Sequence, residues 1–149
     1  MFTGKYIHSI DEKGRVVLPS GIRKQFEDTG KCIISPGIDG QLRINLPDQY
    51  QAYLDREEAT APTPEIRRRV RLFANSASEQ SLDKAGRVVI NELLRGMADI
   101  SIGTEVMISG ANRFAEIWNL EKFARDDAIA RAELAQKIAE DNQKGVTAS

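Results

Sequence analysis

The chain has 149 residues, of which 41% are hydrophobic and 29% charged, enough for one compact domain or two small intertwined ones. This composition excludes wholesale disorder and a disulfide scaffold. Lysine and arginine total 21 against 22 acidic residues, a net charge of -1, so the chain is not a polycation that coats nucleic acid. Any binding to nucleic acid must therefore rest on local charge.

An internal repeat organises the chain. Residues 10–23 and 82–95 align with a shift of 72 positions, where six of 14 residues are identical and three more exchange Ile for Leu. The match continues with one-residue slips, at 33–37 against 107–110 and at 44–46 against 117–119. We interpret the chain as two copies of a unit of about 50 residues.

The first copy is predicted to begin with a short strand at 6–10, a polar turn at 11–14 and a β-branched strand at 16–18. The turn has the composition of a connection between hairpin strands. A second pair of strands is expected at 32–35 and 41–45, and its counterparts in the second copy are 105–109 and 114–118. Because four short strands cannot bury two faces alone, we expect both copies to complete one shared β core.

Helices are predicted after each copy of the turn and after each copy of the unit. Ser20, after Pro19, and Asn91 are the expected N-caps of two short helices. Their predicted apolar faces carry Ile22, Phe26, Leu94 and Ala98. Longer helices are expected at 48–58, 65–76 and 120–142, with a linker at 60–64 and a frayed end at 145–149.

The pattern Asp-x-x-Gly-Arg is the feature that recurs with its polar residues intact. It comprises Asp11, Gly14 and Arg15, and again Asp83, Gly86 and Arg87. A turn accounts for the Asp, which accepts backbone N–H groups, and for the Gly, which adopts positive φ. It does not account for the arginine, whose fork of donors suits duplex phosphates or guanine edges.

Two lysines strengthen the interpretation that these turns bind DNA. Lys13 adds a cation to the first turn and Lys84 to the second. A carboxylate four residues before the arginine would orient the guanidinium and reduce the entropy lost on binding. The alternative, which the pattern leaves open, is an internal Asp–Arg ion pair whose only role is to close the turn.

Four segments give the chain a specific resemblance. They are residues 1–6 (MFTGKY), 11–19 (DEKGRVVLP), 82–90 (LDKAGRVVI) and 113–118 (RFAEIW). The chain resembles the MraZ family over roughly residues 1–142. The resemblance implies two SpoVT-AbrB-type units in a tandem swapped-hairpin α+β fold with flanking helices. Implied boundaries are unit 1 at 5–51, a helical linker at 52–76, unit 2 at 77–124 and a C-terminal helix with tail at 125–149.

The resemblance also implies a function and an assembly. Members of this family include ring-forming transcriptional regulators that bind short direct repeats upstream of the bacterial division and cell-wall gene cluster. The family's Asp-x-x-x-Arg motif falls on Asp11 to Arg15 and on Asp83 to Arg87. This sequence departs from the family at Asn91, where a proline is usual, and at Ala85, which stands where the first copy has Lys13.

Other candidate residues have simpler explanations. Arg67, Arg68, Arg69 and Arg71 are expected on a solvated or inter-subunit helix face, with DNA contact as the alternative. That face lies opposite the apolar stripe of the same helix, which comprises Ile66, Val70, Phe73 and Ala77. Trp118, with Phe114 and Phe123, is expected in the core or an interface. His8 and Cys32 are the only residues of their kinds, so we expect structural roles for both and no tetrahedral zinc site.

The residues distinguish three classes of function. A sequence-specific DNA-binding regulator fits best, with double-stranded DNA and further copies of the chain as partners. A protein-interaction module of the antitoxin type is the alternative. An enzyme is not expected, because no phosphate-binding glycine loop, metal-ligand cluster or nucleophile–histidine pair can be assembled. We expect no cofactor, no membrane partner, and a cytoplasmic, nucleoid-associated protein.

Charge is divided unevenly along the chain. Residues 1–75 contain 12 basic and 10 acidic residues (+2), whereas residues 76–149 contain 9 and 12 (-3). The near-zero total therefore describes a dipolar protomer. A ring of such protomers would gather its cationic turns on one face and its acidic C-terminal helices elsewhere.

Overall fold

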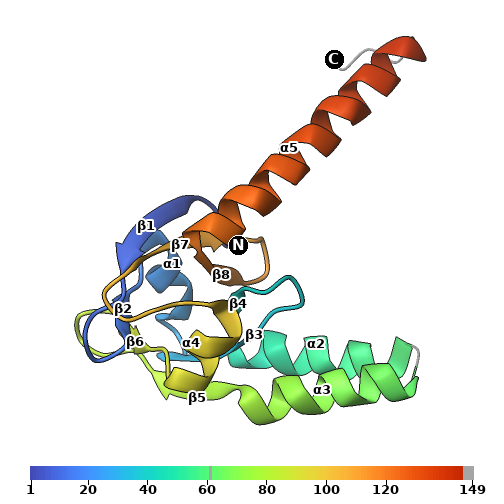
Figure 1. Cartoon of the computed structure of the whole chain (residues 1–149). Helices are drawn as coiled ribbons and strands as arrows, with labels where there is room; N and C mark the ends of the chain where they lie inside the picture. Colours follow the sequence, from blue (N-terminus) through green and yellow to red (C-terminus); the bar gives the residue numbers. More distant parts are fainter. Residues whose placement is uncertain (61, 146–149) are drawn as a thin grey trace.

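The structure, a computed structural model, describes residues 1–60 and 62–145 and belongs to the α+β class (Figure 1). Its strands are β1 (Lys5–Ser9), β2 (Arg15–Val17), β3 (Lys31–Pro36), β4 (Leu42–Asn45), β5 (Ser78–Ser81), β6 (Arg87–Val89), β7 (Glu105–Gly110) and β8 (Ala115–Asn119). Its helices are α1 (Ser20–Arg23), continued by the 3-10 turn η1 (Lys24–Phe26), α2 (Pro47–Thr60), α3 (Pro64–Ser76), α4 (Glu92–Ala98) and α5 (Leu120–Gln143).

Strands from both copies alternate within one antiparallel sheet. The order is β1-β7-β8-β4-β3-β5, so β1 of the first copy pairs with β7 of the second, and β5 of the second pairs with β3 of the first. Each strand and its counterpart in the other copy lie at equal distances from opposite edges of the sheet: β1 with β5, β7 with β3, and β8 with β4. The fold therefore has an approximate twofold axis between β4 and β8. The prediction of a shared β core is confirmed.

A separate two-stranded ribbon lies on the same axis. β2 and β6 pair antiparallel with Val16 opposite Val88, and both valines are buried. Side chains on one face of the large sheet join them in the hydrophobic core. Among these are Ile34, Ile44 and Ile117, which alternate along their strands with residues of the opposite face.

The opposite face of the sheet is also covered, but its buried residues are largely polar. Ser35, Arg43 and Asn45 lie there, and Asn45 Nδ2 donates to Ser35 Oγ at 3.0 Å. The hairpin of α2 and α3 packs on this part of the sheet, and the Tyr50 hydroxyl of α2 donates to the Phe73 carbonyl of α3 at 3.0 Å.

Two local predictions are wrong. Ser20 is the first residue of α1 rather than its N-cap, since Pro19 holds that position and no side-chain cap bond forms. The strands flanking the turn at 11–14 do not build a hairpin with each other, because β1 pairs with β7 and β2 pairs with β6. Asn91 does cap α4, accepting from the Leu94 N–H at 3.0 Å.

The long helices lie close to their predicted positions. α2 begins at Pro47, and α3 begins one residue earlier than expected because Thr63 caps it by accepting from the Ile66 N–H at 3.2 Å. α5 projects away from the sheets (Figure 1), and none of its residues is buried. Of the segment predicted to fray, residues 146–149 lie outside the described residues.

Within residues 1–60 and 62–145, no helix combines the length and the apolar character needed to cross a bilayer. The same residues contain no cluster of three or more His, Cys, Asp or Glu side chains placed to hold a metal ion. Cys32 is buried on the core side of β3, and burial raises the pKa of its thiol to about 12. Its predicted role as a small buried hydrophobe is confirmed.

Candidate nucleic-acid interface

The first loop, residues 11–15, is closed by one carboxylate. Asp11 Oδ1 accepts the backbone N–H groups of Lys13 at 2.9 Å and Arg15 at 2.8 Å, while Oδ2 accepts Arg15 Nε–H at 2.8 Å. Gly14 donates its N–H to the Asp11 carbonyl at 3.0 Å and has a φ of +78°, which glycine adopts without steric cost. Asp11, Gly14 and Arg15 therefore form one hydrogen-bonded turn.

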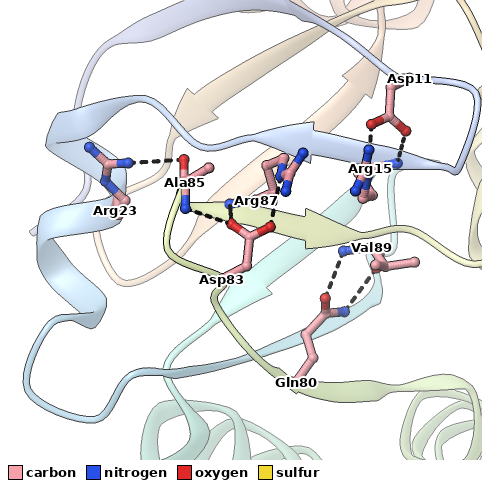
Figure 2. A network of polar contacts seen from close by, with 8 residues as sticks. All are labelled: Asp11, Arg15, Arg23, Gln80, Asp83, Ala85, Arg87 and Val89. Atoms are coloured by element: carbon pink, nitrogen blue, oxygen red, sulfur yellow. Dashed lines mark hydrogen bonds and ion pairs between the residues drawn. The ribbon is translucent and has the colours of Figure 1, made fainter.

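The second loop, residues 83–87, has the same geometry. Asp83 Oδ1 accepts the N–H groups of Ala85 at 2.9 Å and Arg87 at 2.8 Å, and Oδ2 accepts Arg87 Nε–H at 2.7 Å. Gly86 has a φ of +74°. The internal Asp–Arg ion pair that the sequence left open is thus present in both loops (Figure 2).

The ion pair leaves part of each arginine free. Each guanidinium meets its carboxylate through Nε, and among the described residues no hydrogen-bond partner is found for the Nη atoms of Arg15 or Arg87. Their side chains are 29% and 36% exposed. The arginine is therefore held at its base, and the terminal fork can bind a further acceptor.

The carboxylates stay charged under ordinary conditions. The backbone N–H of Arg15 is the main cause that lowers the pKa of Asp11, and the backbone N–H of Arg87 lowers that of Asp83 in the same way. Each loop is thus closed by an ionised aspartate at neutral pH.

Register places the two arginines on one face of the β2–β6 ribbon. Arg15 lies opposite Val89, and Arg87 lies opposite Val17. Since alternate residues of a strand share a face, these four side chains face away from the buried pair between them. Arg15 and Arg87 are diagonal neighbours, with Cα atoms about 7–8 Å apart. Both loops were predicted from the sequence. The pairing of β2 with β6, which brings the two loops together on one ribbon, was not predicted.

Arginines of the short helices lie against the loops of the opposite copy. Arg23 Nη1 donates to the Ala85 carbonyl in the second loop at 3.1 Å (Figure 2). Its repeat counterpart, Arg95, donates to the Ile90 carbonyl and lies where a Cβ on Gly14 would be. Sequence reasoning missed this role, although Arg23 and Arg95 are identical residues of the repeat and that identity was a usable signal.

A glutamine fixes one edge of the ribbon. Gln80 accepts the Val89 N–H through Oε1 at 2.7 Å and donates to the Val89 carbonyl through Nε2 at 2.8 Å (Figure 2). The residue 72 positions earlier is His8, half-buried in β1. No pattern in the sequence indicates this role of the glutamine, because its contact depends on how β5 passes the ribbon.

The loops differ in charge. Lys13 and Lys84 are both exposed, but they occupy the third and second positions of their loops and are not repeat counterparts. The first loop has two acidic and two basic residues, a net charge of 0. The second has one acidic and two basic residues, a net charge of +1, so the absence of a lysine at Ala85 does not leave it less cationic.

Comparison with known proteins identifies the family. A family model described as "MraZ protein, putative antitoxin-like" matches residues 1–70. The chain is 34% identical over 145 residues to "Transcriptional regulator MraZ" of Roseiflexus castenholzii, covering 94% of this chain and 98% of that protein. The chain belongs to the MraZ family. The same-named proteins of Clostridium acetobutylicum (31% over 143 residues, 94% and 98% coverage) and Spiroplasma kunkelii (34% over 119 residues, 79% and 81%) are also similar.

In this MraZ family member the remaining candidates are the aromatic residue Trp118 and the arginines of α3. Trp118 is buried, and its ring meets that of Phe123 edge-on with centroids 6.1 Å apart, as the core interpretation predicted. Of the α3 arginines, Arg68 and Arg71 are exposed. Arg69 instead lies toward α2 and pairs with Glu57, so the prediction that all four face away from the apolar stripe is wrong for it.

Proposed function

We propose that this chain is a sequence-specific DNA-binding transcriptional regulator that binds short repeats upstream of the division and cell-wall gene cluster. It would do so through the two Asp-x-x-Gly-Arg loops, presented by a ring of identical subunits. The name "Transcriptional regulator MraZ", carried by the relatives from Roseiflexus castenholzii and Clostridium acetobutylicum, supports the regulatory part of the proposal.

One observation carries the DNA-binding part: two arginine forks, each held at Nε, stand on the same face of a two-stranded ribbon. The major groove of B-DNA admits a two-stranded β-ribbon, and the arginine fork matches O6 and N7 of guanine or two phosphate oxygens. A side chain whose base is already fixed loses less entropy on binding. Arg15 and Arg87 are the proposed DNA-binding residues, with Lys13 and Lys84 as phosphate contacts.

The proposed orienting residues act through the arginines. Asp11 and Asp83 hold the guanidinium groups, and Gly14 and Gly86 supply the positive φ that closes each turn. This assignment joins the two earlier interpretations, because the ion pair closes the loop and also directs the arginine.

A ring would solve a problem of affinity. The few cations of one protomer neutralise few phosphates, so a single ribbon binds weakly. Several ribbons on consecutive repeats make later contacts intramolecular and raise the affinity by about 10² or more. The exposed apolar residues Ile129, Leu134 and Ile138 on the projecting α5 support contacts between subunits.

We also propose the swapped-hairpin arrangement of two SpoVT-AbrB-type units, with the boundaries predicted from the sequence, and a cytoplasmic, nucleoid-associated location. The exchange of β1 and β5 between the copies supports the swapped arrangement. The antitoxin-type interaction module stays the second candidate, favoured by the wording of the family description and by the same exposed residues of α5.

Gel-shift titration against the DNA upstream of the protein's own gene tests the proposal. We expect Arg15→Ala and Arg87→Ala each to weaken binding roughly 10- to 100-fold, the cost of one lost bidentate contact. Arg125→Ala removes the same charge from an exposed position of α5 and should bind as the unmodified protein does. Equal binding by all four proteins would refute the role of the loops, and a toxin recovered in a one-to-one complex would favour the second candidate.

A further inference from the structure

A buried arginine on the α2 side of the sheet is not used by the loops. Arg43 of β4 is only 8% exposed, and its guanidinium lies between two rings, 4.0 Å from the centroid of Tyr53 and 3.7 Å from that of Phe114. Its Nε donates to Asn45 Oδ1 at 3.1 Å, so the edge formed by the two Nη atoms is the part of the group that can bind a further acceptor. The rings and Asn45 therefore fix the plane in which Arg43 presents that edge.

No ion pair within the described part of the chain involves Arg43. Glu116 lies directly opposite it in the pairing of β4 with β8. The carboxylate of Glu116 instead accepts Gln41 Nε2–H at 2.6 Å and Trp118 Nε1–H at 3.2 Å. A guanidinium stays charged in proteins, and a buried charge is costly unless it is paired. Burial lowers the pKa of Arg43, in agreement with a charge removed from water.

A cavity of about 300 Å³ adjoins this arginine, at the lower end of the range for small-molecule sites. Three arginines and three acidic residues are among those that line it: Arg43, Arg56, Arg113, Asp39, Glu57 and Glu116. Glu57 is already paired with Arg69, which does not line the cavity. Counting that pair as neutral, the lining keeps three positive and two negative charges, a net charge of +1.

We propose that this cavity binds a small anion that carries a carboxylate or phosphate group. Two of its oxygens accept the Nη edge of Arg43, the bidentate geometry for which a planar guanidinium is suited. Arg113, in the loop before β8, is exposed and contributes charge at the rim. The proposal is independent of DNA binding, since none of the lining residues belongs to the two loops.

The chain contains its own reporter for this site. Trp118 is the only tryptophan, and its indole N–H donates to Glu116, which lines the cavity. Inorganic phosphate and succinate, titrated separately against the full chain in a chloride buffer of constant ionic strength, serve as the two probes. We expect a saturable change in tryptophan emission below about 10 mM for at least one of them, and the responding probe tells phosphate from carboxylate recognition.

Two variants test the assignment. Arg43→Lys keeps the charge and loses the planar fork, so the apparent Kd should rise at least tenfold. Arg113→Gln changes an exposed residue, so folding is not at risk, and its Kd should rise a few-fold. Arg125→Gln, outside the cavity, should titrate as the unmodified chain does. No saturable response to either probe, or an unchanged Kd in both Arg43→Lys and Arg113→Gln, would overturn the proposal.

Discussion

Arg23 of α1 donates a hydrogen bond to the carbonyl oxygen of Ala85, which lies 62 residues later in the loop of the other copy. Arg95 of α4 occupies the corresponding place beside the first loop, where it would meet a Cβ on Gly14. Each loop therefore lies against an arginine from a helix of the opposite copy, and the second loop also accepts a hydrogen bond from it. The geometry of the two arginine forks depends on the correct pairing of both halves of the chain.

Arg23→Ala should loosen the second loop and leave the first unchanged. One hydrogen bond contributes about 0.5–1.5 kcal/mol, so we expect the protection of the Ala85 and Arg87 amides to fall by about 2- to 12-fold. Amide hydrogen exchange by NMR measures this, with Lys13 and Arg15 as the internal comparison. An equal loss of protection in both loops would show that the brace does not act locally.

Alanine at the two loop glycines should destabilise the fold. Gly14 and Gly86 have φ near +75°, and a Cβ at either would collide with the bracing arginine, so we expect a loss of about 1–3 kcal/mol in the free energy of unfolding. Urea titration measures it. At Gly30 an added Cβ has no atom within 4 Å, so Gly30→Ala should lose only the cost of a φ of +64°. Gly96→Ala in α4 should raise the free energy of unfolding by about 0.5–1 kcal/mol. Equal losses at all four positions would contradict this account.

Acid should open the loops. Because the folded pKa of Asp11 and Asp83 is depressed, their stabilising contribution is present above the unfolded value of about 3.9 and is lost as the pH falls through the folded value. We expect carboxyl ¹³C titrations of both aspartates to have midpoints below about 3.9. Asp11→Asn should remove the pH dependence of amide protection at Lys13 and Arg15 and leave that at Ala85 and Arg87 unchanged. Midpoints at or above about 3.9 would contradict the observed hydrogen bonds.

Salt dependence should separate the lysines from the arginines. Lys13→Ala and Lys84→Ala each remove one phosphate contact, so the slope of log K against log salt should become shallower by about 0.9 per contact. Affinity should fall alike on the operator and on unrelated DNA. Arg15→Ala should reduce operator affinity more than affinity for unrelated DNA. If the lysine variants lost affinity for the operator alone, lysine would be part of the sequence readout.

Charge on α5 should block assembly and leave the fold intact. Leu134 is 60% exposed, so Leu134→Glu costs the protomer little, yet it places a charge within the proposed subunit contact. Light scattering should show smaller species with an unchanged circular dichroism spectrum. Gln136→Glu adds a charge at another exposed α5 position, outside the apolar set of Ile129, Leu134 and Ile138, and should assemble normally. An unchanged mass for Leu134→Glu would exclude this face from the ring.

Local patterns in the sequence predicted the features that depend on near neighbours. The repeat located β3 and β4 with their counterparts, and the spacing of Asp11, Gly14 and Arg15 indicated a closed turn. The N-cap of α1 lies one residue before the predicted Ser20, because Pro19 already has the extended backbone that an N-cap position requires.

Contacts between distant segments were outside the reach of these patterns. The pairing of β2 with β6 depends on the register of strands 72 residues apart. The clamp of Gln80 on Val89 and the two rings around Arg43 likewise depend on where whole elements pass each other. An isolated arginine in a strand gives no sign that aromatic rings will enclose it.

Arg43 and Glu116 occupy matching places in the two copies, and the approximate twofold axis brings them face to face. Two separate, identical half-length chains would place the same residue on both sides of that axis, and like charges opposite each other are destabilising. Joining the halves in one polypeptide lets each side change alone. The molecule can therefore keep the matched pair Arg15 and Arg87 on its ribbon. Near the same axis it has a cavity lined by Arg43 from one copy and by Glu116 from the other.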